Sequence, residues 1–131
     1  MNIINKDALL GIEFLSYITT NASKRCSAIE FALKSGNPIE YTYQTCRKLR
    51  KAGLLSSNRG RKGSYVVNNL ALEKYSVLDY MKYFNGAASL DVVSNTPIGA
   101  LISRIIRYLD TVRLKDIVEG NNNEQFFKWS S

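Results

Sequence analysis

The sharpest structural signals in this sequence frame a helix between Asn37 and Gly53. Asn37 is a preferred N-cap residue, Pro38 suits the first helical position, and Glu40 follows the cap by three residues. Gly53 suits the left-handed conformation that stops a helix, which should therefore end at about Ala52. Positions at helical spacing form the inward-facing side: Ile39, Thr42, Cys46 and Leu49.

The other side of this helix is polar, basic and aromatic. Its members are Tyr41, Tyr43, Gln44, Arg47, Lys48, Arg50 and Lys51. Eighteen Lys and Arg against eleven Asp and Glu give the chain a net charge of +7, and seven of those cations fall between Arg47 and Lys62. No acidic residue occurs from Tyr41 through Leu72. Such a segment predicts affinity for an anionic partner, either nucleic acid or a membrane surface.

Two helices are predicted before this one. The first spans about residues 5–19, and its apolar side is formed by Ala8, Leu9, Ile12, Leu15 and Ile18. The second begins at Ser27, which makes an S-x-x-E capping box with Glu30, and it ends at Gly36. Its inward side is predicted to be Ile29, Ala32 and Leu33.

A Gly-rich, basic connection follows the framed helix. Residues 54–57 and 64–67 are β-prone runs, and they flank the segment NRGRKG at positions 58–63. Two short helices joined by a tight turn, followed by a hairpin with a basic tip, predict a helix-turn-helix with a wing. The predicted fold class is therefore mainly α with a small β-hairpin (α+β).

The C-terminal part carries a wide apolar stripe. Residues 76–84 predict a short helix, residues 85–95 a loop, and Thr96-Pro97 opens a long helix to about residue 112, with a short helix at 114–118. The stripe on the long helix is almost wholly branched-aliphatic: Ile98, Leu101, Ile102, Ile105, Ile106, Leu109 and Val112. It predicts a dimer interface, and burial within the monomer is the alternative. We therefore expect a winged helix-turn-helix domain at 1–84, and a linker, dimerisation helix and tail at 85–131.

Duplex DNA would meet this fold through the framed helix and the wing. In the major groove, the side chains expected to reach base edges are Tyr41, Tyr43 and Gln44. The cations expected to meet phosphates are Arg47, Lys48, Arg50 and Lys51. The wing would contact DNA through Arg59, Arg61 and Lys62, with the first two near the minor groove. The alternatives are a solvated basic surface and, for the tyrosines, packing on the domain edge.

Several function classes lose support from what the sequence lacks. The chain has no histidine, which excludes His-based acid–base catalysis and His-containing metal sites. None of the phosphate-binding or nucleophile-elbow patterns occurs, so neither an enzyme nor a cofactor is expected. Asp7 and Glu13 interrupt any signal-peptide apolar region, and no apolar run is long enough to span a membrane. We expect a cytoplasmic protein without a membrane partner.

The two cysteines give no disulfide framework. Cys46 falls on the inward side of the framed helix, where a thiol behaves as a small hydrophobe. Cys26 lies beside Arg25 just before a helix, a setting that could lower the thiol pKa. A structural role is expected for both, and a thiol sensor using Cys26 is the alternative.

Several short segments, taken in order, resemble one family of regulators. They are SAIE (27–30), Tyr41 and Gln44, LRKAGL (49–54), SNRG (57–60), GSY (63–65), SVLDY (76–80) and LDTVRLKDIV (109–118). Together they resemble the bacterial winged-helix repressors that include the iron–sulfur regulator IscR, the nitric-oxide regulator NsrR and the cysteine-metabolism regulator CymR. The resemblance covers nearly the whole chain, to about Glu119.

The resemblance implies a homodimer whose long helices cross and place two winged helices on one palindromic operator. Carried over by position, Glu40, Tyr41, Gln44 and Arg59 correspond to DNA-contacting places, while Tyr43 replaces an acidic residue that often reads bases in relatives. Cluster-binding relatives carry three closely spaced cysteines before the dimerisation helix, and residues 85–96 contain none here. A cluster held in the family's way is therefore not expected, because its thiolate ligands are missing.

Sequence alone thus favours a sequence-specific, homodimeric DNA-binding transcription regulator, acting as a repressor by occupying a promoter. A protein-interaction module that keeps the winged-helix fold and binds another regulator is the second hypothesis. The two differ in whether the chain binds duplex DNA in a salt-dependent manner.

Overall fold

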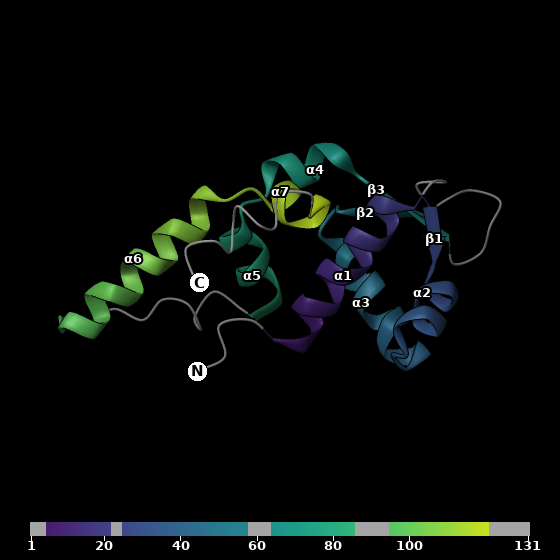
Figure 1. The fold of residues 1–131 in the computed structure, drawn as a ribbon, viewed down its shortest axis with the longest axis horizontal. Helices are drawn as coiled ribbons and strands as arrows, with labels where there is room; N and C mark the ends of the chain where they lie inside the picture. Colours follow the sequence, from purple (N-terminus) through teal and green to yellow (C-terminus); the bar gives the residue numbers. More distant parts are fainter. Residues whose placement is uncertain (1–4, 22–24, 58–63, 86–94, 121–131) are drawn as a thin grey trace.

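The computed structural model describes residues 5–21, 25–57, 64–85 and 95–120 (Figure 1). Its helices and strands follow in the order α1 (Lys6–Thr20), β1 (Arg25–Ser27), α2 (Ala28–Ser35), α3 (Ile39–Lys51), β2 (Leu55–Ser57), β3 (Ser64–Val67), α4 (Asn69–Lys74), α5 (Val77–Asn85), α6 (Pro97–Thr111) and α7 (Leu114–Glu119). This arrangement confirms the predicted fold class, mainly α with a small antiparallel hairpin.

Helix α1 is central to the fold, with α3, α5, α7 and the sheet packed around it (Figure 1). Asn5 caps it by accepting a hydrogen bond from the Ala8 amide at 2.8 Å. The buried side comprises Ala8, Leu10, Gly11, Phe14, Leu15 and Ile18. The prediction that Leu9 faces inward is wrong, because the large Phe14 and its neighbour Leu10 turn the buried side away from Leu9, which is 47% exposed.

Helix α2 begins and ends as predicted. The Ser27 hydroxyl accepts from the Glu30 amide at 3.0 Å, and Gly36 ends the helix in the left-handed region at φ 77°. The predicted inward side is wrong at two positions, since Ile29 and Leu33 are 52% and 81% exposed. The buried residues are Ala28, Phe31 and Ala32. Phe31 decides the orientation because its ring packs edge-on against Phe14, with centroids 5.0 Å apart.

Helix α3 buries Thr42, Thr45, Cys46 and Leu49, while Ile39 is only half-buried. The N-cap is Pro38 rather than the predicted Asn37, whose side-chain amide instead donates to the Ser35 hydroxyl at 2.9 Å. The stop at Gly53 is confirmed by its φ of 82°. Helices α2 and α3 pack against each other and form the helix-turn-helix.

The hairpin is part of a larger sheet than the sequence predicted. Strands β2 and β3 pair antiparallel, with Leu55 opposite Val67 and Ser57 opposite Tyr65. Strand β1, which was not predicted, adds to the other side of β3 and gives the order β1-β3-β2. Because β1 leads directly into α2, this pairing ties the wing strands to the start of the helix-turn-helix.

Helix α5 confirms the predicted short helix, whereas α4 was not predicted. Tyr80 of α5 is fully buried, and its hydroxyl donates to the Ala8 carbonyl of α1 at 2.6 Å. Its ring also packs on Phe84, with centroids 4.7 Å apart. These contacts join α5 to the centre of the winged helix.

Helices α6 and α7 occur where the sequence predicted them. Thr96 caps α6 by accepting from the Gly99 amide at 3.1 Å, and α6 projects away from the rest of the molecule (Figure 1). Its base is held where the Ser76 hydroxyl donates to Asp110 at 2.9 Å and the Val77 amide donates to the Val112 carbonyl at 2.8 Å. Helix α7 packs on α1 and α4. The division at residues 84 and 85 stays a prediction.

Gly11 offers a test of the α1–α5 contact. A Cβ at this position would overlap the Tyr80 hydroxyl and lie 3.2 Å from the Leu49 side chain. We expect Gly11→Ala to lower the free energy of unfolding by about 1–3 kcal/mol, because the rigid, buried Tyr80 has no room to move. At an unhindered helical site the same change stabilises by roughly 0.5–1 kcal/mol. Urea unfolding measures the difference.

The matched experiment repeats Gly11→Ala in a Tyr80→Phe background. Since that background lacks the overlapping oxygen, the cost of Gly11→Ala should be smaller there than in the wild type. Additive effects of the two substitutions would contradict the packing described.

Candidate nucleic-acid interface

The outer side of α3 presents a polar stripe with two cations. Glu40, Gln44, Arg47 and Lys51 follow one another at spacings of four, three and four, which places them on one side of the helix, and all four are exposed. Arg50 is exposed beside them. The inner side is anchored by buried Cys46 and Leu49, so the stripe has a fixed orientation. This surface can meet a groove and its phosphates.

Lys48 and Tyr41 lie on the edge of α3 that faces α1. The Lys48 ammonium forms an ion pair with Asp7 of α1 and lies 6.0 Å from the centroid of the Phe84 ring. The Tyr83 hydroxyl donates to the Lys48 carbonyl at 2.8 Å. The Lys48–Asp7 pair lowers the carboxyl pKa of Asp7. Lys48 is thus drawn toward α1 in this structure.

The Tyr41 hydroxyl is buried, and no hydrogen-bond partner satisfies it among the described residues. Burial, followed by the nearby Asp7 carboxylate, raises the pKa of Tyr41 to about 12. Tyr43 marks the other edge of α3 and packs partly buried against the main core. Both tyrosines therefore flank the stripe, and their role in DNA contact stays a prediction.

The described residues include the wing strands β2 and β3 but not the connection between them. Strands β2 and β3 end at Ser57 and Ser64, and the predicted contacts Arg59, Arg61 and Lys62 lie outside the described residues. The hairpin follows α3 closely, since the Leu54 amide donates to the Leu49 carbonyl at 3.0 Å and the Asn68 amide to the Leu54 carbonyl at 2.9 Å. The base of the hairpin is thereby held at the end of α3 that carries Arg47, Arg50 and Lys51.

Comparison with protein families decides where this fold belongs. Residues 4–120 match the model of the Rrf2 family, described as an iron-dependent transcriptional regulator. The chain belongs to the Rrf2 family. As a member it is a DNA-binding transcription regulator, in a family whose members are not enzymes, and the predicted resemblance to IscR, NsrR and CymR is confirmed.

Solved structures agree with this Rrf2 fold. The chain is similar to Staphylococcus aureus CymR at 22% identity and a TM-score of 0.66, covering 88% of this chain and 97% of that one. It is also similar to the oxidized form of that protein at 23% identity and a TM-score of 0.67, covering 91% and 97% of the two chains. B. subtilis CymR (YrzC), the global cysteine regulator, aligns at 19% identity and a TM-score of 0.68, covering 90% and 97%. No curated protein sequence matches the chain.

Iron fits this Rrf2 chain poorly. The whole sequence offers two cysteines and no histidine, and both cysteines are buried. Within the described ranges, no three acidic, cysteine or histidine residues come together in a way that could hold a metal ion. Thiolate or imidazole ligation of an iron or a cluster needs more donors than these. The family's iron dependence is therefore not transferred to this chain.

Neither cysteine is in a setting that favours the thiolate. Cys26 is 2% exposed, and burial followed by the Glu30 carboxylate raises the pKa of its thiol to about 12. The alternative of a lowered pKa at Cys26 is thus not supported, because Arg25 is exposed while Glu30 lies nearby. Burial also raises the pKa of the Cys46 thiol to about 12, and the buried position predicted for Cys46 is confirmed.

Among the described residues, none of the helices combines the length and apolar character required for crossing a lipid bilayer.

The thiols give a second test. With a pKa near 12 in place of 9.0, each thiol forms roughly a thousandfold less thiolate at pH 8 than an ordinary cysteine. We expect both to react slowly with a thiol-specific disulfide reagent in the native protein and rapidly in urea. Because folding favours the neutral thiols, their contribution to stability is complete below pH 9 and is lost as the pH rises toward 12. Fast native reaction of Cys26 at pH 8 would contradict this description.

Proposed function

We propose that this protein is a homodimeric repressor that binds a palindromic operator in duplex DNA through α3 and the wing, without an iron–sulfur cluster. The observation that carries the proposal is the exposed stripe on α3, with Arg47 and Lys51 in line and the base of the β2–β3 hairpin held at the same end of the helix. Since its partner is chromosomal DNA, the proposed location is the cytoplasm of a bacterium.

The stripe supplies both kinds of contact that an operator needs. Gln44 is able to donate and accept at a base edge, and Glu40 accepts from a cytosine amino group. Arg47 and Lys51 carry the charge that neutralises phosphates and releases counterions. We keep Tyr41, Tyr43 and Lys48 as flanking contacts. Their partial burial or their ion pair on α1 means that they would have to turn outward to reach DNA.

The wing completes this interface in the proposal. Arg59 and Arg61 would enter the adjacent minor groove, where negative potential concentrates, and Lys62 would meet a phosphate. With no acidic residue from Tyr41 through Leu72, the connection and α3 attract the same polyanion.

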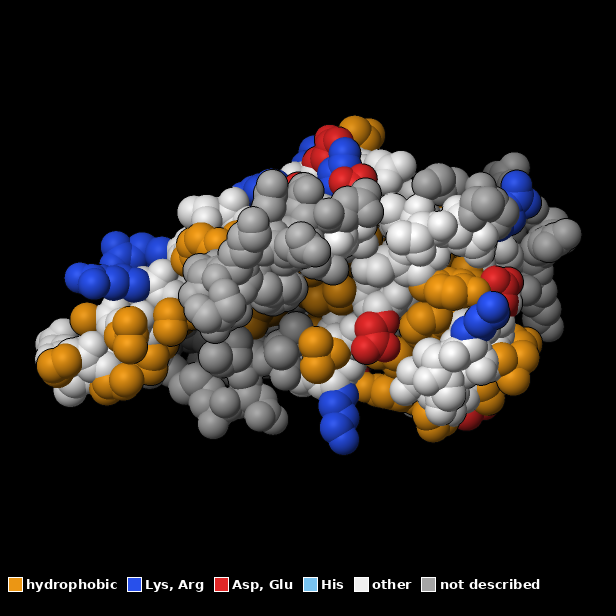
Figure 2. Space-filling view, in the orientation of Figure 1, with side chains coloured by type: hydrophobic (Ala, Val, Ile, Leu, Met, Phe, Trp, Pro, Cys, Tyr) orange, Lys and Arg blue, Asp and Glu red, His pale blue; other side chains and the backbone are white. Residues whose placement is uncertain are grey.

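The outer side of α6 supports the homodimer. Ile98, Leu101 and Ile105 are 61%, 51% and 43% exposed, whereas Ile106 and Leu109 pack on Leu78 and Met81 of α5. Ile102 and Val112 are half-buried. Figure 2 shows hydrophobic side chains gathered along one side of α6 and basic side chains along its opposite edge. Covering such a stripe with a second α6 would remove it from water.

Arg47 provides the test of DNA binding. We expect Arg47→Ala to weaken binding to a mixed-sequence duplex and to reduce the slope of log affinity against log salt by about one, because one phosphate contact is lost. Arg59→Ala should also weaken operator binding. Fluorescence anisotropy at several salt concentrations measures both.

The matched control is Arg107→Ala, which removes an equal charge from the exposed surface of α6. It should leave the salt slope unchanged. If the wild type binds duplex DNA without any salt dependence, the proposal fails and the protein-interaction module becomes the better reading.

A charge placed in the α6 stripe tests the dimer. Leu101→Asp should shift the protein to monomers in sedimentation equilibrium, because a carboxylate would be buried against apolar side chains. Ala100→Asp introduces the same charge at an exposed position on the other side of α6 and should leave the association state unchanged. A wild-type protein that sediments as a monomer at all concentrations would overturn the homodimer.

A further inference from the structure

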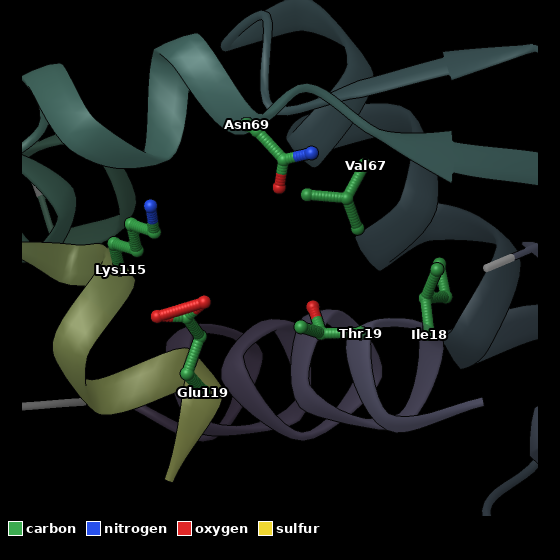
Figure 3. Close-up of a pocket in the computed structure, with 6 residues that line it drawn as sticks. All are labelled: Ile18, Thr19, Val67, Asn69, Lys115 and Glu119. Atoms are coloured by element: carbon green, nitrogen blue, oxygen red, sulfur yellow. The ribbon is translucent and has the colours of Figure 1, made fainter. Parts of the chain in front are cut away.

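A hollow of about 390 Å³ lies between α1, the end of β3, α4 and α7 (Figure 3). It is lined by Ile18, Thr19, Val67, Asn69, Lys115 and Glu119. The volume falls within the range of small-molecule sites in proteins. None of these residues belongs to the proposed DNA-binding stripe or to the apolar side of α6, so the hollow has no role in the function argued above.

Two polar groups face this hollow without a partner in the described part of the chain. The Glu119 carboxylate and the Asn69 amide make no ion pair or side-chain hydrogen bond with another described residue. Figure 3 shows both side chains pointing into the hollow from opposite walls, with Lys115 beside them. Glu119 is partly buried and Asn69 is exposed, and both have unused hydrogen-bonding capacity that a polar ligand can satisfy.

Lys115 supplies the opposite charge. Its ammonium is held 2.9 Å from Glu73, which leaves further N–H donors of the same group for a ligand. Glu73 is the main cause of the raised pKa of Lys115, and Glu119 contributes to it. Lys115 and Glu119 are four residues apart on α7, but no ion pair joins them within the described residues. A cation and an anion thus lie close together, and each can still contact a ligand.

Such an arrangement discriminates among ligand classes by charge. A simple anion would leave Glu119 uncompensated, and a simple cation would meet Lys115 with like charge. A molecule with a carboxylate and an ammonium on one carbon can contact both groups and adds no net charge to the site. Ile18 and Val67 line the remaining wall and suit an apolar side chain.

We propose that the hollow binds a free α-amino acid with a small apolar side chain. Its carboxylate is held by Lys115 and Asn69, and its ammonium by Glu119. The role of this site in sensing a metabolite rests on the proposed function. Binding itself is measured on the protein without DNA, so the site and the DNA-binding function fail separately.

The test is calorimetric titration of the full-length protein with individual L-amino acids. Each is compared with the amine that lacks its carboxylate and the acid that lacks its ammonium. We expect at least one apolar amino acid to bind about tenfold or more tightly than either analogue, because each analogue loses one charge-assisted contact. Binding of the amine alone as tightly as the amino acid would overturn the proposal.

Variants assign the contacts. Lys115→Met should weaken amino-acid binding and erase the preference over the amine, while Glu119→Gln should erase the preference over the deaminated acid. Asp116→Asn removes an exposed carboxylate from the same helix outside the lining and should bind like the wild type. Thermal melts check that each variant is folded. The proposal fails if no amino acid binds, or if Lys115→Met and Glu119→Gln leave binding unchanged.

Discussion

The burial of α1 is the constraint on which the other parts of the structure depend. Its apolar side packs on α3, α5 and α7, and the Tyr80 hydroxyl closes the contact by donating to the Ala8 carbonyl at 2.6 Å. The close approach at Gly11 leaves no space for a side chain between α1 and α5. Because α3 is held on this support by Cys46 and Leu49, its outer stripe has one orientation. Any account of DNA binding starts from that fixed orientation.

Helix boundaries were predictable because they are encoded locally. Ser27, Gly36, Gly53 and Thr96 start or stop helices through their own hydrogen bonds or backbone conformations, and the structure confirms each of them. Inward-facing sides depend on the neighbours and were predicted less well. Ile29 and Leu33 have the right spacing to be buried, but the contact between Phe31 and Phe14 decides which side of α2 turns inward. Strand β1 was missed because it exists only through pairing with β3, which is distant in sequence.

In the candidate site, too, local features were predicted and contacts between distant segments were not. The sequence identified the four cations of α3, and all four are exposed, as a DNA-binding surface requires. The ion pair between Lys48 and Asp7 was not predicted, because it joins two helices that are far apart in the sequence. The raised pKa of the Cys26 thiol was not predicted, because the neighbouring Arg25 is visible in the sequence while burial and the approach of Glu30 are not. The hollow beside α7 has no sequence signal, as its lining comes from four separate elements.

The most direct test of the central claim is the selection of bound fragments from a genomic library by the purified protein, followed by footprinting of the enriched duplex. We expect an inverted repeat that is protected symmetrically, with half-sites about one or more helical turns apart, or roughly 34–36 Å for each turn. Failure to enrich any duplex, or a single asymmetric footprint of one half-site, would contradict a homodimer that places two α3 helices on DNA.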